Sequence, residues 1–187
     1  MRDLRLRTAT LPLLVLAAAL AGGCSPEARR HAADARFHAI YEAEWRWRKE
    51  QLPGVEDSNQ PLADRLPKVD PVSQQQRREH WEETLRTVNA LARETLSPDE
   101  QVNYDIYRAQ LQVLIDNQRF RDFEMPANSD STFWTDLGYT ARRPFRSLTD
   151  YQHWIAQMRD IPRYFAEQME EMRAGMKRGF TPPRVTL

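Results

Sequence analysis

Apolar residues recur every three or four positions along most of the chain, and this spacing predicts an all-α protein. The first predicted helix runs from about residue 26 to 51 and ends at the Leu52-Pro53-Gly54 turn. Its apolar side is rich in aromatic residues, and Glu44 lies among them. A second helix is predicted over residues 73–96, on an apolar stripe made of Trp81, Leu85, Val88 and Ala92.

The third predicted helix has the clearest start signal in the chain. Ser97 stands where an N-cap is expected, Pro98 takes the first helical position, and Glu100 follows three residues after the cap. The helix is apolar all round except for one polar stripe, made of Asp105, Arg108, Gln112, Asp116 and Arg119. We therefore expect this helix to be mostly buried, at the centre of a helical bundle.

Residues 121–147 break the helical pattern, because aromatic residues alternate there with Pro126, Gly138 and Pro144. A long irregular segment of this kind either carries function or fills gaps between helices, and gap filling is the favoured interpretation. Helical spacing resumes near Thr149, where Gln152 follows three residues later, and Pro162 predicts a kink or a new helix start. The apolar stripe then continues to Gly179 through Ile161, Phe165, Met169, Met172 and Met176.

These elements predict a bundle of about four to five helices with one long, irregular, aromatic-rich segment. The methionine-rich stripe favours ordinary helix packing, although a methionine face can also bind a ligand. Because the stripe runs almost to the end of the sequence, we expect part of its packing partner to be missing. The predicted bundle is accordingly part of a larger all-helical fold.

The N-terminal sequence has the pattern of an export signal. Three arginines precede an apolar run over residues 8–21, and Gly22-Gly23-Cys24 follows. A cysteine in this place resembles the lipobox of bacterial lipoproteins, which implies that residues 1–23 are a signal peptide and that Cys24 carries the lipid. An ordinary secretory signal and a membrane-spanning helix are the alternatives, but the run is short for a span and contains Pro12.

A lipid on Cys24 would place the protein in the cell envelope, with the membrane as its partner. In Gram-negative lipoproteins an Asp after the cysteine tends to retain the protein at the inner membrane, so Ser25 favours the outer membrane, facing the periplasm. Removal of residues 1–23 would take three Arg and one Asp from the 27 basic and 27 acidic residues, leaving 24 and 26. This balance argues against nucleic acid as a partner. A lipid on the single cysteine also excludes a disulfide within residues 24–187.

None of the four histidines stands in a metal-binding motif such as His-Glu-x-x-His. His31 and His38 lie about two helical turns apart and are expected to be solvated. His80 precedes Glu82 and Glu83 in no metal-ligand pattern, and His153 is expected to be a surface or packing residue. The sequence also has no Gly-x-Ser-x-Gly elbow and no Gly-rich phosphate loop.

Glu44 offers the one further candidate for chemistry, as a buried acid with a raised pKa. The favoured interpretation is a paired or snorkelling carboxylate. We therefore assign no catalytic and no metal-binding residue within this sequence.

Four stretches together resemble the N-terminal part of the DUF885 family of bacterial, often lipid-anchored, all-helical proteins. They are the acidic cap with the Asn-Tyr-Asp helix at 96–105, then residues 145–151, 158–164 and 172–184, and the resemblance covers roughly residues 35–187. It implies that residues 24–187 are an incomplete helical DUF885-like N-terminal region, since the sequence stops at Leu187.

Family members resemble zinc-dependent peptidases with a His-Glu-x-x-His motif far downstream, so zinc is implied for the full-length family. No family ligand or catalytic residue can be placed on this chain. The first hypothesis is therefore an N-terminal fragment of a lipid-anchored peptidase-like protein, inactive alone, whose partner is the missing C-terminal region. The second is a complete small helical envelope lipoprotein that binds a partner or a ligand.

Overall fold

The computed structural model describes residues 25–54, 61–127, 132–140 and 142–184. These residues form five α-helices: α1 (Pro26–Gln51), α2 (Pro71–Asn89), α3 (Pro98–Phe120), the six-residue α4 (Thr135–Thr140) and α5 (Leu148–Lys177). Two short 3-10 turns, η1 (Arg93–Thr95) and η2 (Asp122–Glu124), flank α3. The described part of the chain contains no β-strand beyond a single bridge between Ala127 and Thr132. The all-α prediction is therefore confirmed.

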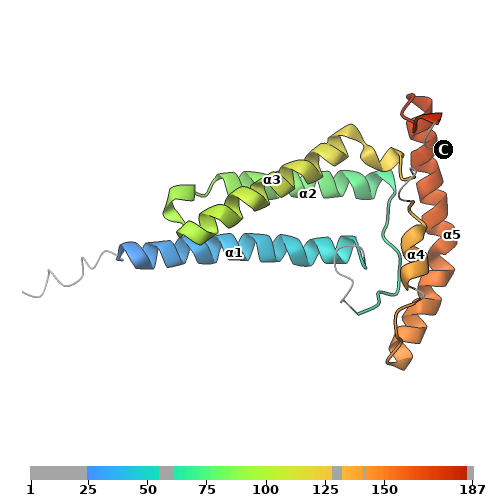
Figure 1. Cartoon of the computed structure of the whole chain (residues 1–187), viewed down its shortest axis with the longest axis horizontal. Coiled ribbons are helices and arrows are strands. Elements are labelled where there is room, and N and C mark those ends of the chain that lie inside the picture. The colour runs from blue at the N-terminus through green and yellow to red at the C-terminus, as the bar shows by residue number, and fades with distance from the viewer. Residues whose placement is uncertain (1–24, 55–60, 128–131, 141, 185–187) are drawn as a thin grey trace, which may run out of the picture.

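Helices α1, α2 and α3 lie alongside one another, and α5 crosses the end of this three-helix bundle with α4 beside it (Figure 1). Seven buried residues make the core of the bundle: Phe37, Trp81, Val88, Leu96, Tyr104, Leu111 and Ile115. They come from α1, α2, α3 and the turn that precedes α3, so the main core of the protein lies away from α5.

The start of α1 follows directly from its sequence. Ser25 caps the helix, because its hydroxyl accepts a hydrogen bond from the Ala28 N–H at 3.1 Å, and Pro26 takes the first helical position. The predicted bounds of this helix are confirmed.

Helix α2 differs from its prediction at the C-terminal end. It begins at Pro71 with Asp70 as its cap and ends at Asn89, well before residue 96. Arg93 lies beyond this end, and its guanidinium binds Asp105 at 2.6 Å and Gln101 at 2.9 Å. These bonds hold the η1 turn against α3. Ala92, which was predicted to belong to the apolar stripe of the second helix, therefore lies beyond the end of α2.

Helix α3 begins at Pro98 as predicted, but its capping differs. The Ser97 side chain makes no capping bond, and the Ser97 N–H instead donates to the Asp34 carboxylate of α1 at 2.9 Å. The expected central burial of α3 is wrong. One face, with Leu111, packs into the core, while the opposite face leaves Ile106 63% exposed and Val113 58% exposed.

The segment predicted as irregular over 121–147 contains η2 and α4. Helix α5 starts at Leu148 with a capping box between Ser147 and Asp150, two residues before the predicted Thr149 and Gln152 pair. The helix continues through Pro162, so the predicted new start is wrong. Pro162 is exposed, and the carbonyl that its ring leaves without a donor can therefore meet solvent.

Polar contacts join helix α5 to the segment that precedes α2. This extended segment, residues 61–70, lies along α5, and α5 side chains bind its backbone. The carboxylates of Asp160 and Glu167 accept from the N–H groups of Leu66 and Val69, each at 2.9 Å. Gln157 donates to the Ala63 carbonyl at 2.7 Å, and Arg163 donates to the Leu66 carbonyl at 3.0 Å.

The opposite side of α5 is apolar and exposed. Its exposed residues recur at alternating spacings of three and four from Leu148 through Tyr151 and Ile155 to Met158, and Met169 and Met176 continue the same stripe about three and five turns farther along. The favoured prediction of ordinary packing for the methionine stripe is therefore wrong for Met169 and Met176, whereas Phe165 packs on Phe133 with ring centroids 4.9 Å apart. None of the described helices is both long and apolar enough to cross a membrane.

Candidate functional site

Glu44 lies in the middle of the three-helix bundle with every carboxylate oxygen bonded. It is 2% exposed and forms a two-pronged ion pair with Arg48, one turn later on α1, at 2.8 and 2.7 Å. The indole N–H of Trp81 from α2 donates to it at 2.9 Å, and the hydroxyl of Tyr107 from α3 donates at 3.2 Å. The favoured prediction of a paired carboxylate is confirmed, and this acid holds three helices together.

Two neighbours of Glu44 have shifted pKa values. Burial raises the pKa of the Tyr107 hydroxyl, and the negative charge of Glu44 adds to the effect. Burial lowers the pKa of His80, which the charge of Glu44 partly opposes. His80 stacks on Trp47 with ring centroids 3.6 Å apart, and its Nε2 is buried without a hydrogen-bond partner in the described part of the chain.

The other three histidines each have a different environment. His31 is exposed on α1, as predicted, while the half-buried His38 Nε2 lies 2.8 Å from a Glu100 carboxylate oxygen. His153 Nδ1 lies 2.6 Å from the Leu62 carbonyl oxygen, so this residue helps to dock segment 61–70 on α5. Among the residues whose structure is described, no group of three or more His, Cys, Asp or Glu is placed to hold a metal ion.

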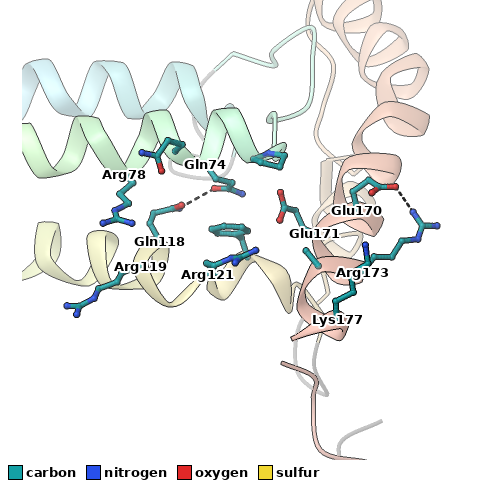
Figure 2. Close-up of a pocket in the computed structure, with 13 residues that line it drawn as sticks. Gln74, Arg78, Gln118, Arg119, Arg121, Glu170, Glu171, Arg173 and Lys177 are labelled. Carbon is teal, nitrogen blue, oxygen red and sulfur yellow. Dashed lines mark hydrogen bonds and ion pairs between the residues drawn. The ribbon is translucent and has the colours of Figure 1, made fainter. Parts of the chain in front are cut away.

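A pocket of about 440 Å³ lies where α5 meets α2 and the end of α3 (Figure 2). Three parts of the chain far apart in sequence line it: the first turns of α2, the end of α3 with η2, and the second half of α5. Five of its side chains are cationic, Arg78, Arg119, Arg121, Arg173 and Lys177, and two are acidic, Glu170 and Glu171. The pocket is the strongest candidate site in the described structure.

Glu171 is the buried acid of this pocket. It is 3% exposed, and its Oε1 has no hydrogen-bond partner among the described residues. Figure 2 shows its carboxylate reaching from α5 toward Gln74 of α2. Burial raises the pKa of Glu171 to about 7, and the negative charge of Glu124 adds to the shift.

Glu124 and Gly175 set the close approach of η2 to α5. Glu124 is 1% exposed and pairs with two guanidinium groups, those of Arg121 and Arg178. A Cβ on Gly175 would lie 2.7 Å from the Glu124 carbonyl oxygen, so only glycine fits at this position of α5. The glycine lets the two elements touch and thereby brings the Glu124 and Glu171 carboxylates close enough to interact.

The cations of the pocket differ in how far they are neutralised. Arg78 pairs with Glu82 at 2.8 Å, Arg173 pairs with Glu170 at 2.8 Å, and Arg121 pairs with Glu124. Arg119 and Lys177 are exposed and make no ion pair within the described residues. The pocket therefore offers positive charge at its rim and one unbonded acidic oxygen in its wall.

Sequence reasoning did not find Glu171 or Glu124. Glu171 belongs to a polar stripe of α5 that resembles a solvated helix face, and Glu124 stands in the segment expected to be irregular. Gly175 was the available signal, because an isolated glycine inside a helical pattern indicates a close approach of another element. Cys24, the predicted lipidation site, lies outside the described residues.

The family with the description "Bacterial protein of unknown function (DUF885)" matches residues 51–187. The chain belongs to the DUF885 family. The match covers all of α2 to α5 and with them the charged pocket, whereas α1 up to residue 50, which carries Glu44, precedes it. No curated protein and no solved structure matches the chain.

Proposed function

We propose that this DUF885 chain is a non-catalytic helical part of a longer, lipid-anchored, zinc-peptidase-like protein of the cell envelope. The observation that carries the proposal is the reversed polarity of α5. Its buried residues include Gln157, Gln168 and Glu171, while its exposed side carries Ile155, Met158, Met169 and Met176. A helix at the surface of a finished fold has the opposite arrangement.

The exposed apolar residues of α5 have the spacing that suits another helix. Positions three and four residues apart form a continuous seam along one side of a helix, and such seams pack against a neighbouring helix. The outer face of α3 adds Val102, Ile106, Val113 and Phe120, all more than half exposed. Further helices of the same protein are the occupants that we propose for both faces.

The described residues include no cluster of side chains that fits a zinc ion. The zinc implied by the family resemblance therefore needs ligands from elsewhere in the protein, and we derive no catalytic step here. The contribution of this region is to wall one side of a substrate cleft. The anchor is Cys24, one residue before the helix cap Ser25, so α1 would start at the membrane surface.

The proposal is tested on the exposed faces. A protein made of residues 25–187 should bind a hydrophobic dye and elute as aggregates in size-exclusion chromatography. A triple variant with Ile155→Gln, Met169→Gln and Met176→Gln should bind much less dye and form fewer aggregates. A matched control on the same helix is Gln152→Ala with Arg159→Gln, since both residues are exposed and polar. A parent chain that is monomeric, binds no dye and unfolds cooperatively contradicts the proposal.

The anchor is tested separately by Cys24→Ser in the expressing bacterium. Loss of membrane association in the variant supports lipidation, because several acyl chains bind a membrane durably while an unmodified chain has no such anchor. Unchanged membrane association of Cys24→Ser contradicts it.

The second candidate function is a small envelope lipoprotein that binds a ligand. The charged pocket favours it, since a buried carboxylate oxygen without a partner is uncommon in a finished protein interior. The same pocket can exist inside a larger protein, so the two functions are compatible. A cooperative, monomeric chain that binds a small molecule would favour this second function over the first.

A further inference from the structure

We propose that the pocket between α2, η2 and α5 binds a phosphate group, either as inorganic phosphate or as a phosphomonoester. This inference goes beyond the proposed function and does not depend on it. It rests on two observations: the excess of cationic side chains that line the pocket, and the unbonded Oε1 of Glu171 in its wall.

The lining charges favour an anion. Five cationic side chains face two acidic ones, and four of the five cations are arginines, whose planar guanidinium groups match the geometry of phosphate oxygens. Arg119 of α3 and Lys177 of α5 make no ion pair within the described structure and are free to contact a ligand. They lie on two different elements, so the two sides of the pocket formed by the end of α3 and by α5 each supply positive charge.

Glu171 then selects the kind of anion. A buried carboxylate oxygen needs a hydrogen-bond donor, and its negative charge repels a fully ionised ligand. An oxyanion that carries its own proton meets both requirements, because its O–H group donates to Oε1 while its other oxygens face the cations. Inorganic phosphate keeps at least one proton throughout the neutral range, whereas a phosphate monoester loses its last proton above its second pKa of about 6. Sulfate has the same shape and carries no proton under these conditions.

The binding should depend on pH. Glu171 faces Asp70 at the start of α2, Glu124 and Arg121 from the η2 side, and Glu170 on its own helix. Burial and the three carboxylates raise its pKa to about 7, which Arg121 partly offsets. Below this value Glu171 is protonated and can donate its own O–H to any oxyanion, so phosphate and sulfate should bind alike. Above it Glu171 is ionised and can only accept, so an oxyanion that keeps a proton, such as inorganic phosphate, should bind better than sulfate.

The experiment is equilibrium dialysis of the full chain against labelled inorganic phosphate at pH 6.0 and pH 8.5, with sulfate and glycerol 3-phosphate as competitors. We expect one saturable site, from which sulfate at pH 8.5 displaces labelled phosphate at least about tenfold less effectively than unlabelled phosphate does, as the loss of one hydrogen bond to a charged group implies. At pH 6.0 sulfate and phosphate should compete about equally. Stronger displacement by glycerol 3-phosphate than by unlabelled phosphate at pH 6.0 assigns the site to a phosphomonoester, and weaker displacement assigns it to free phosphate.

Two variants keep the test specific. Glu171→Gln is nearly the same size, and its amide can donate, so sulfate and phosphate should then compete about equally. Lys177→Ala with Arg119→Ala should weaken the binding of both anions, whereas Arg159→Ala, about five helical turns away in the first half of α5, should change neither. Absence of saturable phosphate binding, equal competition by sulfate in the parent chain at pH 8.5, or an unchanged preference for phosphate in Glu171→Gln at that pH would each overturn the proposal.

Discussion

The three-helix bundle and α5 are built from similar amphipathic helices, yet they use their faces in opposite ways. In the bundle, apolar side chains such as Phe37 and Leu111 are fully buried and the exposed surface of α1 and α2 is mostly polar. In α5 the buried side is polar and the methionine-rich side is exposed. An apolar stripe therefore indicates that a face is made to be covered, and it does not indicate which element covers it.

The same contrast separates the two buried glutamates. Glu44 accepts four hydrogen bonds from Arg48, Trp81 and Tyr107 and is part of the bundle's structure. Glu171 is as deeply buried, and its Oε1 accepts none from the described residues. A saturated buried carboxylate stabilises a fold, whereas an unsaturated one beside a pocket is available to a ligand.

The largest effect is expected at Glu44. Glu44→Ala leaves the Arg48 guanidinium buried without its partner and removes the acceptor of Trp81, so the free energy of unfolding should fall by about 3–5 kcal/mol. Glu42→Ala, on the exposed side of the same helix, should change it by less than about 0.5 kcal/mol. Urea unfolding followed by tryptophan fluorescence measures both, and equal effects of the two substitutions would remove the structural role of Glu44.

The two faces of α3 give the next test. Leu111→Ala should cost about 2–5 kcal/mol, because it opens a cavity in the core. Val113→Ala, two residues away on the exposed face, should cost about 0.5 kcal/mol or less in this chain. In a longer protein whose further helices cover α3, Val113→Ala should become clearly destabilising. Thermal unfolding of both lengths of chain would show whether this difference exists.

Gly175 tests the closeness of η2 to α5. Gly175→Ala should destabilise the chain by about 1–3 kcal/mol, because the new methyl group would overlap the Glu124 carbonyl. Gly138→Ala in α4 meets no atom within 4 Å and should be neutral or slightly stabilising. A stabilising Gly175→Ala, measured by chemical unfolding, would contradict the packing described at this site.

Substitution of Glu171 should have a smaller effect, and it should raise the free energy of unfolding where the preceding substitutions lower it. Its raised pKa means that the folded state favours the protonated form, so the stability contributed by this group is present below its ordinary pKa of 4.5 and is lost as the pH rises through about 7. Glu171→Gln should therefore raise the free energy of unfolding at pH 8 by on the order of 1–2 kcal/mol and change it little at pH 4.5. Unfolding curves at the two pH values provide the comparison, and a variant less stable than the parent at pH 8 would count against a strained carboxylate.

The smallest effect is expected where α5 holds segment 61–70. Asp160→Asn weakens the bonds to Leu66 and Arg163 and should cost about 1 kcal/mol. Hydrogen bonding to Arg163 holds the pKa of Asp160 below its ordinary 3.8, so its contribution is present above that value and is lost as the pH falls through the lowered pKa. The acid limb of the stability curve should be shallower in the Asn variant. If the stability of the parent and of the Asn variant falls equally steeply at acid pH, Asp160 makes no such contribution.

Local sequence signals such as caps and turn residues predicted where the helices lie better than they predicted which helix faces are buried. The bounds of α1 follow from Ser25, Pro26 and the Leu52-Pro53-Gly54 stop, all within a few residues of the helix ends. Beyond the end of α2, Arg93 binds Asp105, 12 residues farther along the sequence, and periodicity carries no information on such a contact. The same holds for α3, whose composition is apolar on two sides, although only one of these sides has a partner among the described residues.

The candidate site was less accessible to sequence reasoning than the fold. The pairing of Glu44 was favoured because a carboxylate in an aromatic helix face must find donors. Glu171, in contrast, lies on a stripe with Gln157, Tyr164 and Gln168 that has the composition of a solvated surface. Its burial depends on η2 and segment 61–70, two irregular parts of the chain whose paths no helical pattern specifies.

The backbone bonds between segment 61–70 and α5 make two amide hydrogens direct reporters of the fold. The N–H groups of Leu66 and Val69 have no partner in a helix, and each is held by a carboxylate of α5. Their exchange with deuterated solvent requires that segment 61–70 and α5 separate, whereas the amides in the middle of α1 to α3 exchange when the bundle itself opens. The ratio of the two protection factors therefore compares the separation of α5 from segment 61–70 with the opening of the bundle, without any substitution in the chain.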